Sequence, residues 1–416
     1  MRILLKNCLI VDPGSPFHNY TKDIFVLDGT ISQQDPIDVD QVFDLNGKMV
    51  SCGWFDLSAQ FHDPGNENKE DMESGIACAI SGGFTDVHLI PDTEPPIDSK
   101  AEVEYLIRQS QKAQIHVSGS LTKQLDGVSL NDILDLKRAG AVSVSEGDGS
   151  IQNSELFLKA LQYTSQVEMP IFQVPRDEML AKFSQMHQGY FSTLLGLRAE
   201  PSLSEVLCIK RDLEILRYSG GRLHFSRLST EKGVRLVSEA KAEGLNVTAD
   251  VALHQLIFTD RSIAEFDTNY KVQPPYREEA DRLALISGVK DGTIDAICSN
   301  HRPQDLDQKE LEFDLAGFGN ISLQTFFPTL LKLTGEVPIE TLIERITIGP
   351  RKILGLPKVQ IKHGMPAKIT AFDPDIEWSL NAETNLSRSK NSPFWEQDLK
   401  GKVLGVVNGT YFSFEG

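Results

Sequence analysis

Eight short apolar segments that alternate with helical stretches between residues 53 and 299 constrain the fold of this chain most strongly. The strand candidates lie at residues 53–60, 84–90, 114–119, 141–145, 170–174, 222–226, 246–251 and 294–299. Between them, residues 101–112, 203–219 and 230–243 repeat apolar side chains at helical spacing. Alternating strands and helices form parallel sheets covered by helices, so the sequence predicts an α/β fold, a (β/α)8 barrel of the TIM type.

The two ends of the chain have a different pattern. Residues 1–52 contain short apolar runs separated by turn sequences such as Asp12-Pro13-Gly14 and Asn46-Gly47, and a β-like pattern returns within 357–416. We therefore divide the chain into segments 1–52, 53–356 and 357–416. Within the barrel segment the alternation is interrupted at 175–202, where we expect a long loop or an extra helix over the barrel mouth.

Charge and cysteine usage exclude several classes of partner and location. The net charge of −18 over 416 residues opposes binding to nucleic acid or to an anionic membrane. The sequence contains no apolar run of membrane-spanning length and no signal-peptide pattern at its start. The five cysteines are scattered and form no CxxC motif, which is typical of reduced thiols in a cytoplasmic protein.

The stretch GWFDLSAQFHDPG, residues 53–65, is the most informative about chemistry. It reads as a strand followed by a polar turn, and barrel enzymes carry their reactive groups at such strand ends. It resembles the first-strand signature of the dihydroorotases, which belong to the amidohydrolase superfamily: an Asp, one residue, His-x-His-x-Arg, and a later Pro-Gly. Asp56, Pro64 and Gly65 match that signature.

The resemblance extends over nearly the whole chain. Segments similar to the family occur in order at 68–98, 121–127, 145–156, 189–197, 223–230, 270–278, 295–303, 349–356 and 392–403. It implies an amidohydrolase-like barrel at 53–356, with segments 1–52 and 357–416 joined in one small β domain. Many matches in the same order support a fold far better than one short motif does.

The positions that the resemblance assigns to metal ligands no longer carry metal-binding side chains. The family uses a metal pair to hold a nucleophilic hydroxide and to polarise a ring carbonyl. Carried over one by one, its ligand positions fall on Ser58, Gln60, Glu146, Gln173, Arg227 and Asn300. Only Glu146 is a zinc ligand of ordinary strength, since Ser, Gln and Asn are weak neutral donors and Arg is a cation. The resemblance therefore predicts a degenerate site with no catalytic residue, no metal and no cofactor.

The positions that contact substrate in the family have changed as well. They fall on His62, Asp92, Gln273 and Gln304, and the carboxylate of Asp92 would repel an anionic substrate. Together with His254 and His301 these residues outline a candidate ligand pocket.

Three arrangements of the mouth follow from these residues. We expect Arg227 to pair with Glu146, because a buried guanidinium requires a carboxylate or carbonyl partner. A rearranged metal site built from His62, His224, His254 and His301 is one alternative, and an anion bound by Arg227 and His62 is another.

For Asp148, in Glu146-Gly147-Asp148-Gly149, a turn role explains the residue better than a shifted catalytic role does.

The sequence thus predicts a dihydroorotase-like protein of pyrimidine biosynthesis that is a pseudoenzyme with a structural or regulatory role. The resemblance makes aspartate carbamoyltransferase the leading candidate partner, and barrels of this type commonly form homo-oligomers. Two alternatives stay open. One is an active dihydroorotase or related cyclic-amide hydrolase with a rearranged site, and the other is a sensor that binds a small molecule in the vacated pocket.

Overall fold

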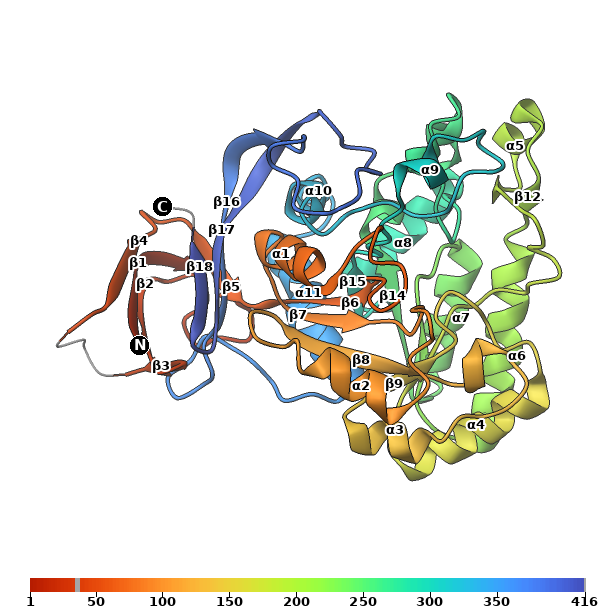
Figure 1. The fold of residues 1–416 in the computed structure, drawn as a ribbon, viewed down its shortest axis with the longest axis horizontal. Coiled ribbons are helices and arrows are strands. Elements are labelled where there is room, and N and C mark those ends of the chain that lie inside the picture. The colour runs from red at the N-terminus through yellow and green to blue at the C-terminus, as the bar shows by residue number, and fades with distance from the viewer. Residues whose placement is uncertain (34–37, 415–416) are drawn as a thin grey trace.

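Eight parallel strands form the barrel in the computed structural model, which describes residues 1–33 and 38–414. In chain order they are β6 (Trp54–Ala59), β7 (Phe84–Leu89), β8 (Gln114–Ser120), β9 (Ser143–Ser145), β10 (Ile171–Gln173), β13 (Leu223–Phe225), β14 (Val247–Ala252) and β15 (Ala296–Cys298). Strands that are neighbours in this order pair in parallel (Figure 1). The predicted (β/α)8 barrel is confirmed.

The first and last barrel strands meet in a short seam. A single bridge joins Ala59 to His301, and the amide N–H of Gln60 donates to the carbonyl of His301 at 2.9 Å. Below this bridge, the buried carboxylate of Asp56 accepts hydrogen bonds from the N–H and the hydroxyl of Ser299, each at 2.6 Å. Side-chain bonds thus replace a regular ladder where β15 returns to β6.

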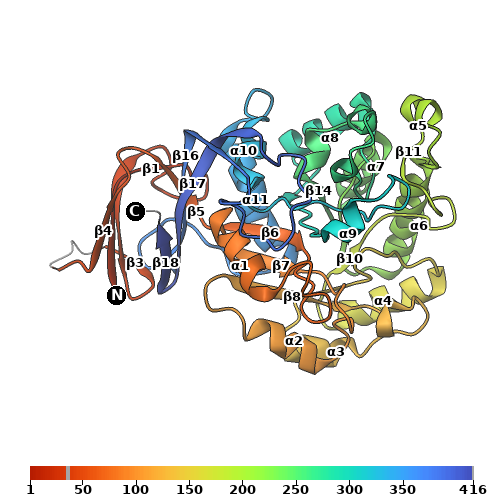
Figure 2. The same ribbon diagram turned by 45° about the horizontal axis from the view of Figure 1, so that its top comes forward.

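Helices surround the barrel (Figure 2), and the three predicted at 101–112, 203–219 and 230–243 are present, although the first ends at Ile107. They are α1 (Met72–Ser81), α2 (Lys100–Ile107), α3 (Ile133–Ala139), α4 (Ser154–Gln166), α6 (Leu203–Ser219), α7 (Glu231–Ala242), α8 (Glu279–Asp291), α9 (Leu306–Lys309), α10 (Phe326–Leu331) and α11 (Ile339–Leu354). Polar N-caps fix several starts: the side chain of Asn153 accepts from the N–H groups of Glu155 and Leu156 at the start of α4. No helix in the described ranges is long and apolar enough to cross a membrane.

The interruption at 175–202 contains a short helix, as expected, between two short strands. These are β11 (Met186–His187), α5 (Tyr190–Leu195) and β12 (Ala199–Glu200). A buried ion pair between Arg277 Nη2 and Glu200 Oε1, at 2.9 Å, attaches this excursion to the barrel. Figure 1 places α5 and β12 at the end of the molecule opposite the β domain.

Both ends of the chain build one sheet beside the barrel. Its strands are β1 (Arg2–Ile10), β2 (Thr21–Leu27), β3 (Thr30–Ser32), β4 (Gln41–Asp44), β5 (Met49–Cys52), β16 (Lys368–Ser379), β17 (Asp398–Asn408) and β18 (Tyr411–Phe414). The order is β18-β17-β16-β5-β1-β2-β3, with β4 on β1, so antiparallel pairing of β5 with β16 joins the two ends. A small β domain formed by both ends is confirmed, while the exact boundaries at 52 and 356 stay predictions.

A buried aromatic and ionic junction holds the two domains together. Trp54 packs against Phe84, Phe327 and Phe372 with ring centroids 5.4–6.1 Å apart. Gly83 lies against that indole with φ of +93°, and a Cβ there would stand 2.7 Å from the ring. Next to it, Asp86 of β7 binds Arg351 Nη2 of α11 at 2.6 Å and Lys368 Nζ of β16 at 2.5 Å.

Candidate site at the barrel mouth

The loops that follow the barrel strands bring most of the predicted site residues together at one end of the barrel. Three of these residues, His62, Arg227 and Asn300, have left-handed backbone conformations, with φ of 55°, 60° and 51°. Such φ values are strained for residues other than glycine and persist only where the surrounding structure enforces them. The backbone at these strand ends therefore has a specialised conformation, although the side chains differ from those that the family resemblance implies.

Asp148 is the centre of an ionic cluster at this mouth. Its carboxylate pairs with Arg227 Nη1 at 2.6 Å and with Arg302 Nη1 at 2.7 Å. It also accepts a hydrogen bond from Gln60 Nε2 at 2.9 Å. Burial alone would raise the pKa of this carboxyl, but the guanidinium groups of Arg302 and Arg227 hold it well below its usual range.

Arg227 lies within the barrel mouth and is nearly completely buried. Besides Asp148, its Nη1 donates to Asn300 Oδ1 at 2.9 Å and its Nη2 to the carbonyl of Gly147 at 3.3 Å. Its own N–H donates to Asp250 Oδ1 at 2.7 Å. These contacts fix a permanent cation at a position for which the family resemblance implies a metal ligand.

The expected pair between Arg227 and Glu146 is wrong. The carboxylate of Glu146 accepts instead from the N–H and the hydroxyl of Thr122, each at 2.8 Å. Burial raises the pKa of Glu146 to about 7, against the lowering effect of these two bonds. Arg227 pairs instead with Asp148, which follows Glu146 after a turn through Gly147 with φ of +60°.

Asp92 contributes a second carboxylate beside Asp148. Its Oδ2 accepts from the N–H of Asp148 at 2.9 Å and from Gln60 Nε2 at 3.2 Å. Burial, followed by the charge of Asp148, raises the pKa of Asp92 to about 7. Near neutral pH the pair therefore carries less than two full negative charges.

His254 and Gln273 complete the far side of this cluster. Asn300 Nδ2 donates to His254 Nε2 at 3.2 Å and to the carbonyl of Gln273 at 3.4 Å. The amide of Gln273 donates in turn to the carbonyl of Asp148 at 3.4 Å. Burial, reinforced by the charge of Arg227, lowers the pKa of His254 to about 3, so its ring is neutral.

Three predicted site residues lie apart from the ionic cluster. Gln173 faces the helices, where its Nε2 donates to Asp212 Oδ2 of α6 at 3.2 Å, because its neighbour Phe172 points into the barrel. Gln304 turns to the carbonyl of Phe318, to which its Nε2 donates at 3.0 Å. Ser58 is buried, and its carbonyl accepts from the hydroxyl of Ser299 at 3.4 Å.

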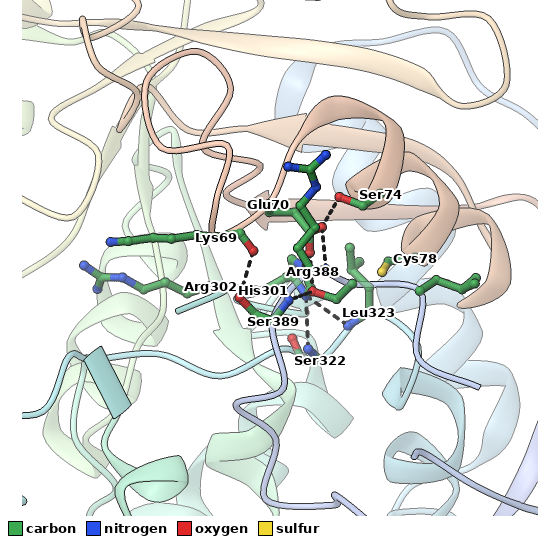
Figure 3. Close-up of polar contacts among 12 residues, drawn as sticks. Lys69, Glu70, Ser74, Cys78, His301, Arg302, Ser322, Leu323, Arg388 and Ser389 are labelled. Atoms are coloured by element: carbon green, nitrogen blue, oxygen red, sulfur yellow. Dashed lines mark hydrogen bonds and ion pairs between the residues drawn. The ribbon is translucent and has the colours of Figure 1, made fainter. Parts of the chain in front are cut away.

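His301 has a separate network that connects the barrel seam to the segment 387–389 (Figure 3). Its Nδ1 accepts from the N–H groups of Ser322 and Leu323, at 3.1 and 3.4 Å, so in the neutral ring Nε2 carries the proton. That nitrogen lies 3.4 Å from the fully buried carboxylate of Glu70. Glu70 also accepts hydrogen bonds from Ser74, Ser387 and the N–H of Arg388.

The four histidines proposed as a rearranged metal site have different partners. His224 lies inside the barrel, where its Nε2 is 2.8 Å from Asp250 Oδ2 and its Nδ1 2.9 Å from the hydroxyl of Thr248. His62 contacts the backbone of Pro303, His254 contacts Asn300, and His301 faces Glu70. Within the described residues, no group of three or more His, Cys, Asp or Glu side chains is arranged to hold a metal ion.

Sequence reasoning missed Arg302 and Glu70 and underestimated Asp148. Arg302 directly follows Asn300 and His301 at a strand end, which is the signal that should have drawn attention to it. Asp148 does lie in a turn, yet it carries both ion pairs of the mouth. Glu70 lies in the acidic run from Glu67 to Glu73, which in sequence reads as the start of a helix, and only its burial reveals the contact with His301.

Comparison with known proteins relates the chain to one family along its whole length. A family model described as dihydro-orotase-like matches residues 47–233. The dihydroorotase of Aquifex aeolicus is 37% identical over 98% of both chains, and that of Ruminiclostridium cellulolyticum is 38% identical over 99% of this chain and 98% of the relative.

Several solved structures have the same fold. An L-hydantoinase (dihydropyrimidinase) from Arthrobacter aurescens superimposes with a TM-score of 0.87 at 22% identity, over 99% of this chain and 96% of that one. A dihydropyrimidinase from Brevibacillus agri gives 0.84 at 18% identity, over 100% and 95%. At these identities the likeness concerns the fold: a barrel with an added β-sheet domain.

Proposed function

This chain belongs to the dihydroorotase family of the amidohydrolase superfamily, and from the side chains at its barrel mouth we propose that it is a member without catalytic activity. The single observation that carries this proposal is the ionic cluster of Arg227, Arg302 and Asp148. A guanidinium cannot ligate a metal ion, and two of them repel a cation.

The donor set at the six family ligand positions does not fit a zinc pair. Ser58, Gln60, Gln173 and Asn300 offer neutral oxygens, and Gln173 faces α6 instead of the mouth. Glu146 is the one carboxylate among the six, and both its oxygens accept hydrogen bonds from Thr122. Without a metal-bound hydroxide, hydrolysis of a cyclic amide loses its nucleophile at neutral pH.

A structural or regulatory role is consistent with a chain that has the family fold but different side chains at the ligand positions, because fold does not determine function. We propose aspartate carbamoyltransferase as the partner, in line with the resemblance that the sequence carries, and a homo-oligomeric state of the chain itself. Co-purification of the two proteins, followed by mass measurement of the complex, tests the partner. A chain that elutes alone from an equimolar mixture contradicts it.

The second candidate is an active dihydroorotase with a rearranged site. The names of the relatives favour it, since proteins 37–38% identical over nearly the whole chain are called dihydroorotases. The carboxyls of Asp92 and Glu146, whose pKa values burial raises to about 7, would be its general acid–base groups.

Turnover of dihydroorotate in both directions separates the two candidates. The purified chain is assayed after chelation and again with added zinc, next to an active relative as control. We expect no turnover under either condition. Turnover that requires zinc, and that is lost in Glu146→Gln or Asp92→Asn, establishes the active enzyme instead.

A further inference from the structure

The excursion between β10 and α6 exposes a concentration of apolar side chains. Among the described residues, seven of the nineteen exposed large hydrophobic residues lie within 179–207. Three of them, Phe183, Tyr190 and Leu194, lie on or beside the unit formed by β11, α5 and β12, and each is 62–69% exposed. They gather at the end of the molecule that lies opposite the β domain (Figure 1). Exposed apolar side chains that cluster in this way indicate a surface that another molecule covers.

Helix α5 carries apolar side chains on two faces, although only one face packs against its own chain. Phe191 and Leu195 pack inward onto a small cluster of buried residues. The buried members of that cluster are Met186, Ile263 and Phe313. Tyr190 and Leu194, four residues apart and therefore on one face, are exposed. The inner face explains how α5 is held, and the outer face is left without a covering element.

Two contacts connect this helical unit with the start of α6. The guanidinium of Arg198, next to β12, lies 5.4 Å from the ring centroid of Phe183. The N–H of Asp177 donates to Ser204 Oγ at 3.0 Å, and that hydroxyl donates to the carbonyl of Asp177 at 3.1 Å. The turn that carries Met179 therefore lies against the first turn of α6, at the end of the molecule that also carries α5 (Figure 2).

The surface continues onto α6 and is large enough for a stable interface. Leu203 and Leu207, one helical turn apart, are 51% and 43% exposed, and Met179 and Leu180 are exposed beside them. At about 200 Å² for a large apolar side chain, the seven residues present on the order of 700 Å² to solvent. This exceeds the roughly 300–600 Å² of the largest patch on a typical monomer. It is close to the roughly 800 Å² that each partner contributes to a standard interface.

The exposed charge of this surface is opposite in sign to that of the molecule. Within 178–210 the exposed charged side chains are those of Lys182, Arg198, Lys210 and Glu178, a net charge of +2. The whole chain carries −18. Two copies of so acidic a chain repel each other, and that repulsion is weakest where positive side chains of one copy approach the acidic surroundings of the other. The charge therefore favours this face for contact between copies.

We propose that a second copy of this chain covers the surface formed by residues 179–207, in a dimer related by a two-fold axis. In such a dimer the same patch of both chains forms the interface. Phe183 and Tyr190 are its anchors, because aromatic side chains at the centre of an interface contribute most of the affinity. The inference rests on the homo-oligomeric state proposed above and adds the face through which that state forms.

Sedimentation velocity of the purified full-length chain, over a range of concentrations, tests the inference. We expect the wild type to sediment with twice the mass of one chain at micromolar concentration. The double variant Tyr190→Glu with Leu194→Glu should raise the dimer dissociation constant by at least about 100-fold, because its carboxylates enter an apolar interface from both copies. Tyr20→Glu, at a residue that is 62% exposed just before β2 in the β domain, is the matched control and should stay dimeric.

Leu194→Ala is a milder variant that introduces no charge. It should weaken the dimer by about tenfold, and a far-UV circular dichroism spectrum equal to that of the wild type shows that each variant is folded. A dimer that persists in the double variant and in Leu194→Ala overturns the assignment of the face and leaves the homo-oligomeric state standing. A wild-type chain that sediments as a monomer overturns both. The assay of dihydroorotate turnover is independent of either result.

Discussion

Asp148 is the residue on which the barrel mouth depends most. Its carboxylate compensates the buried guanidinium of Arg227 and the partly exposed guanidinium of Arg302, which come from different strand ends. Removing one partner of a buried ion pair is far more costly than replacing the whole pair, because the remaining charge stays buried and unpaired. The mouth is therefore sensitive to the loss of this one charge.

We expect Asp148→Asn to lower the free energy of unfolding by about 3 kcal/mol, because Arg227 and Arg302 then repel each other. Urea denaturation measures the change, and the exposed substitution Asp307→Asn is the matched control. The double variant Asp148→Asn with Arg302→Met should lose less than the single variant. A double variant less stable than the single one contradicts the role given to Asp148.

Glu146 should make stability depend on pH. Burial raises its pKa to about 7 in the folded chain, above the value of about 4.3 expected when unfolded. Between these values the folded state binds more protons, so stability decreases as pH rises from about 4 to 7. This one group contributes at most about 4 kcal/mol to that decrease.

Glu146→Gln should remove that contribution and leave a flatter profile of unfolding free energy against pH. Denaturant titrations at several pH values between about 4 and 8 measure it, since this range covers the shift. Glu310→Gln, an exposed substitution, should keep the wild-type slope. Parallel profiles for wild type and Glu146→Gln would rule out this explanation.

At the scale of elements, much of the fold follows from the sequence. All eight barrel strands were predicted within a few residues, and helix α6 occupies Leu203–Ser219, the predicted 203–219. Runs that are buried on both faces and bounded by turns are a strong local signal. In the N-terminal segment the signal was less complete, because two separate apolar runs, residues 3–5 and 9–10, belong to one strand, β1, with an irregularity between Leu5 and Cys8.

The candidate site was less predictable, because it depends on side-chain direction and on reach across the barrel. The assignment of Gln173 identified a position along β10 but not the face of the strand on which its side chain lies. The partner of Arg227 depends on the path of the turn at Gly147, which sequence spacing does not determine. Both depend on contacts between residues distant in the chain.

The segment 387–389 is attached to residues 67–71 through Glu70, and also through bonds of Arg388 to Glu67 and Asp71 and of Ser389 to Lys69. Ser387, the N–H of Arg388 and His301 all converge on the carboxylate of Glu70. We expect Glu70→Gln to weaken these contacts and to speed tryptic cleavage after the exposed Arg388 and Lys390. The rate of that cleavage under native conditions is the measurement.

Ser74→Ala is the control for the segment 387–389, because it removes the hydroxyl that contacts Glu70 and Asp71 at the start of α1 and leaves the bonds of Glu70 to Ser387 and Arg388 in place. Cleavage after Arg388 should stay close to the wild-type rate in this variant. Equal rates in Glu70→Gln and wild type would show that other contacts hold the segment.

At the scale of the whole molecule, Asp86 joins three parts of the structure. It belongs to barrel strand β7 and binds Arg351 of α11, Lys368 of β16 and His116 of β8. Burial raises the pKa of this carboxyl, but Arg351 and its other partners hold that pKa below the usual range. One carboxylate thus connects the barrel to the sheet built by the chain ends.

Asp86→Ala should destabilise the protein by about 3–5 kcal/mol and separate the unfolding of the β domain from that of the barrel. Differential scanning calorimetry measures both effects, as a lower Tm and a second transition. Lys400→Met is the matched control: its pair with Asp375 lies within the β domain, 62% of the lysine and 74% of the aspartate side chain are exposed, and its loss should cost about 0–1 kcal/mol. A single transition at the wild-type Tm in Asp86→Ala would contradict this role.

The seam between β15 and β6 has a consequence for the order of folding. The bridge from Ala59 to His301 connects residues that are distant in the chain, and few backbone bonds hold it. Closing so long a loop brings a large entropic cost for little immediate gain, so the ring of strands should close late, after neighbouring strands have paired. During unfolding, the barrel should open first at this seam and become a curved sheet.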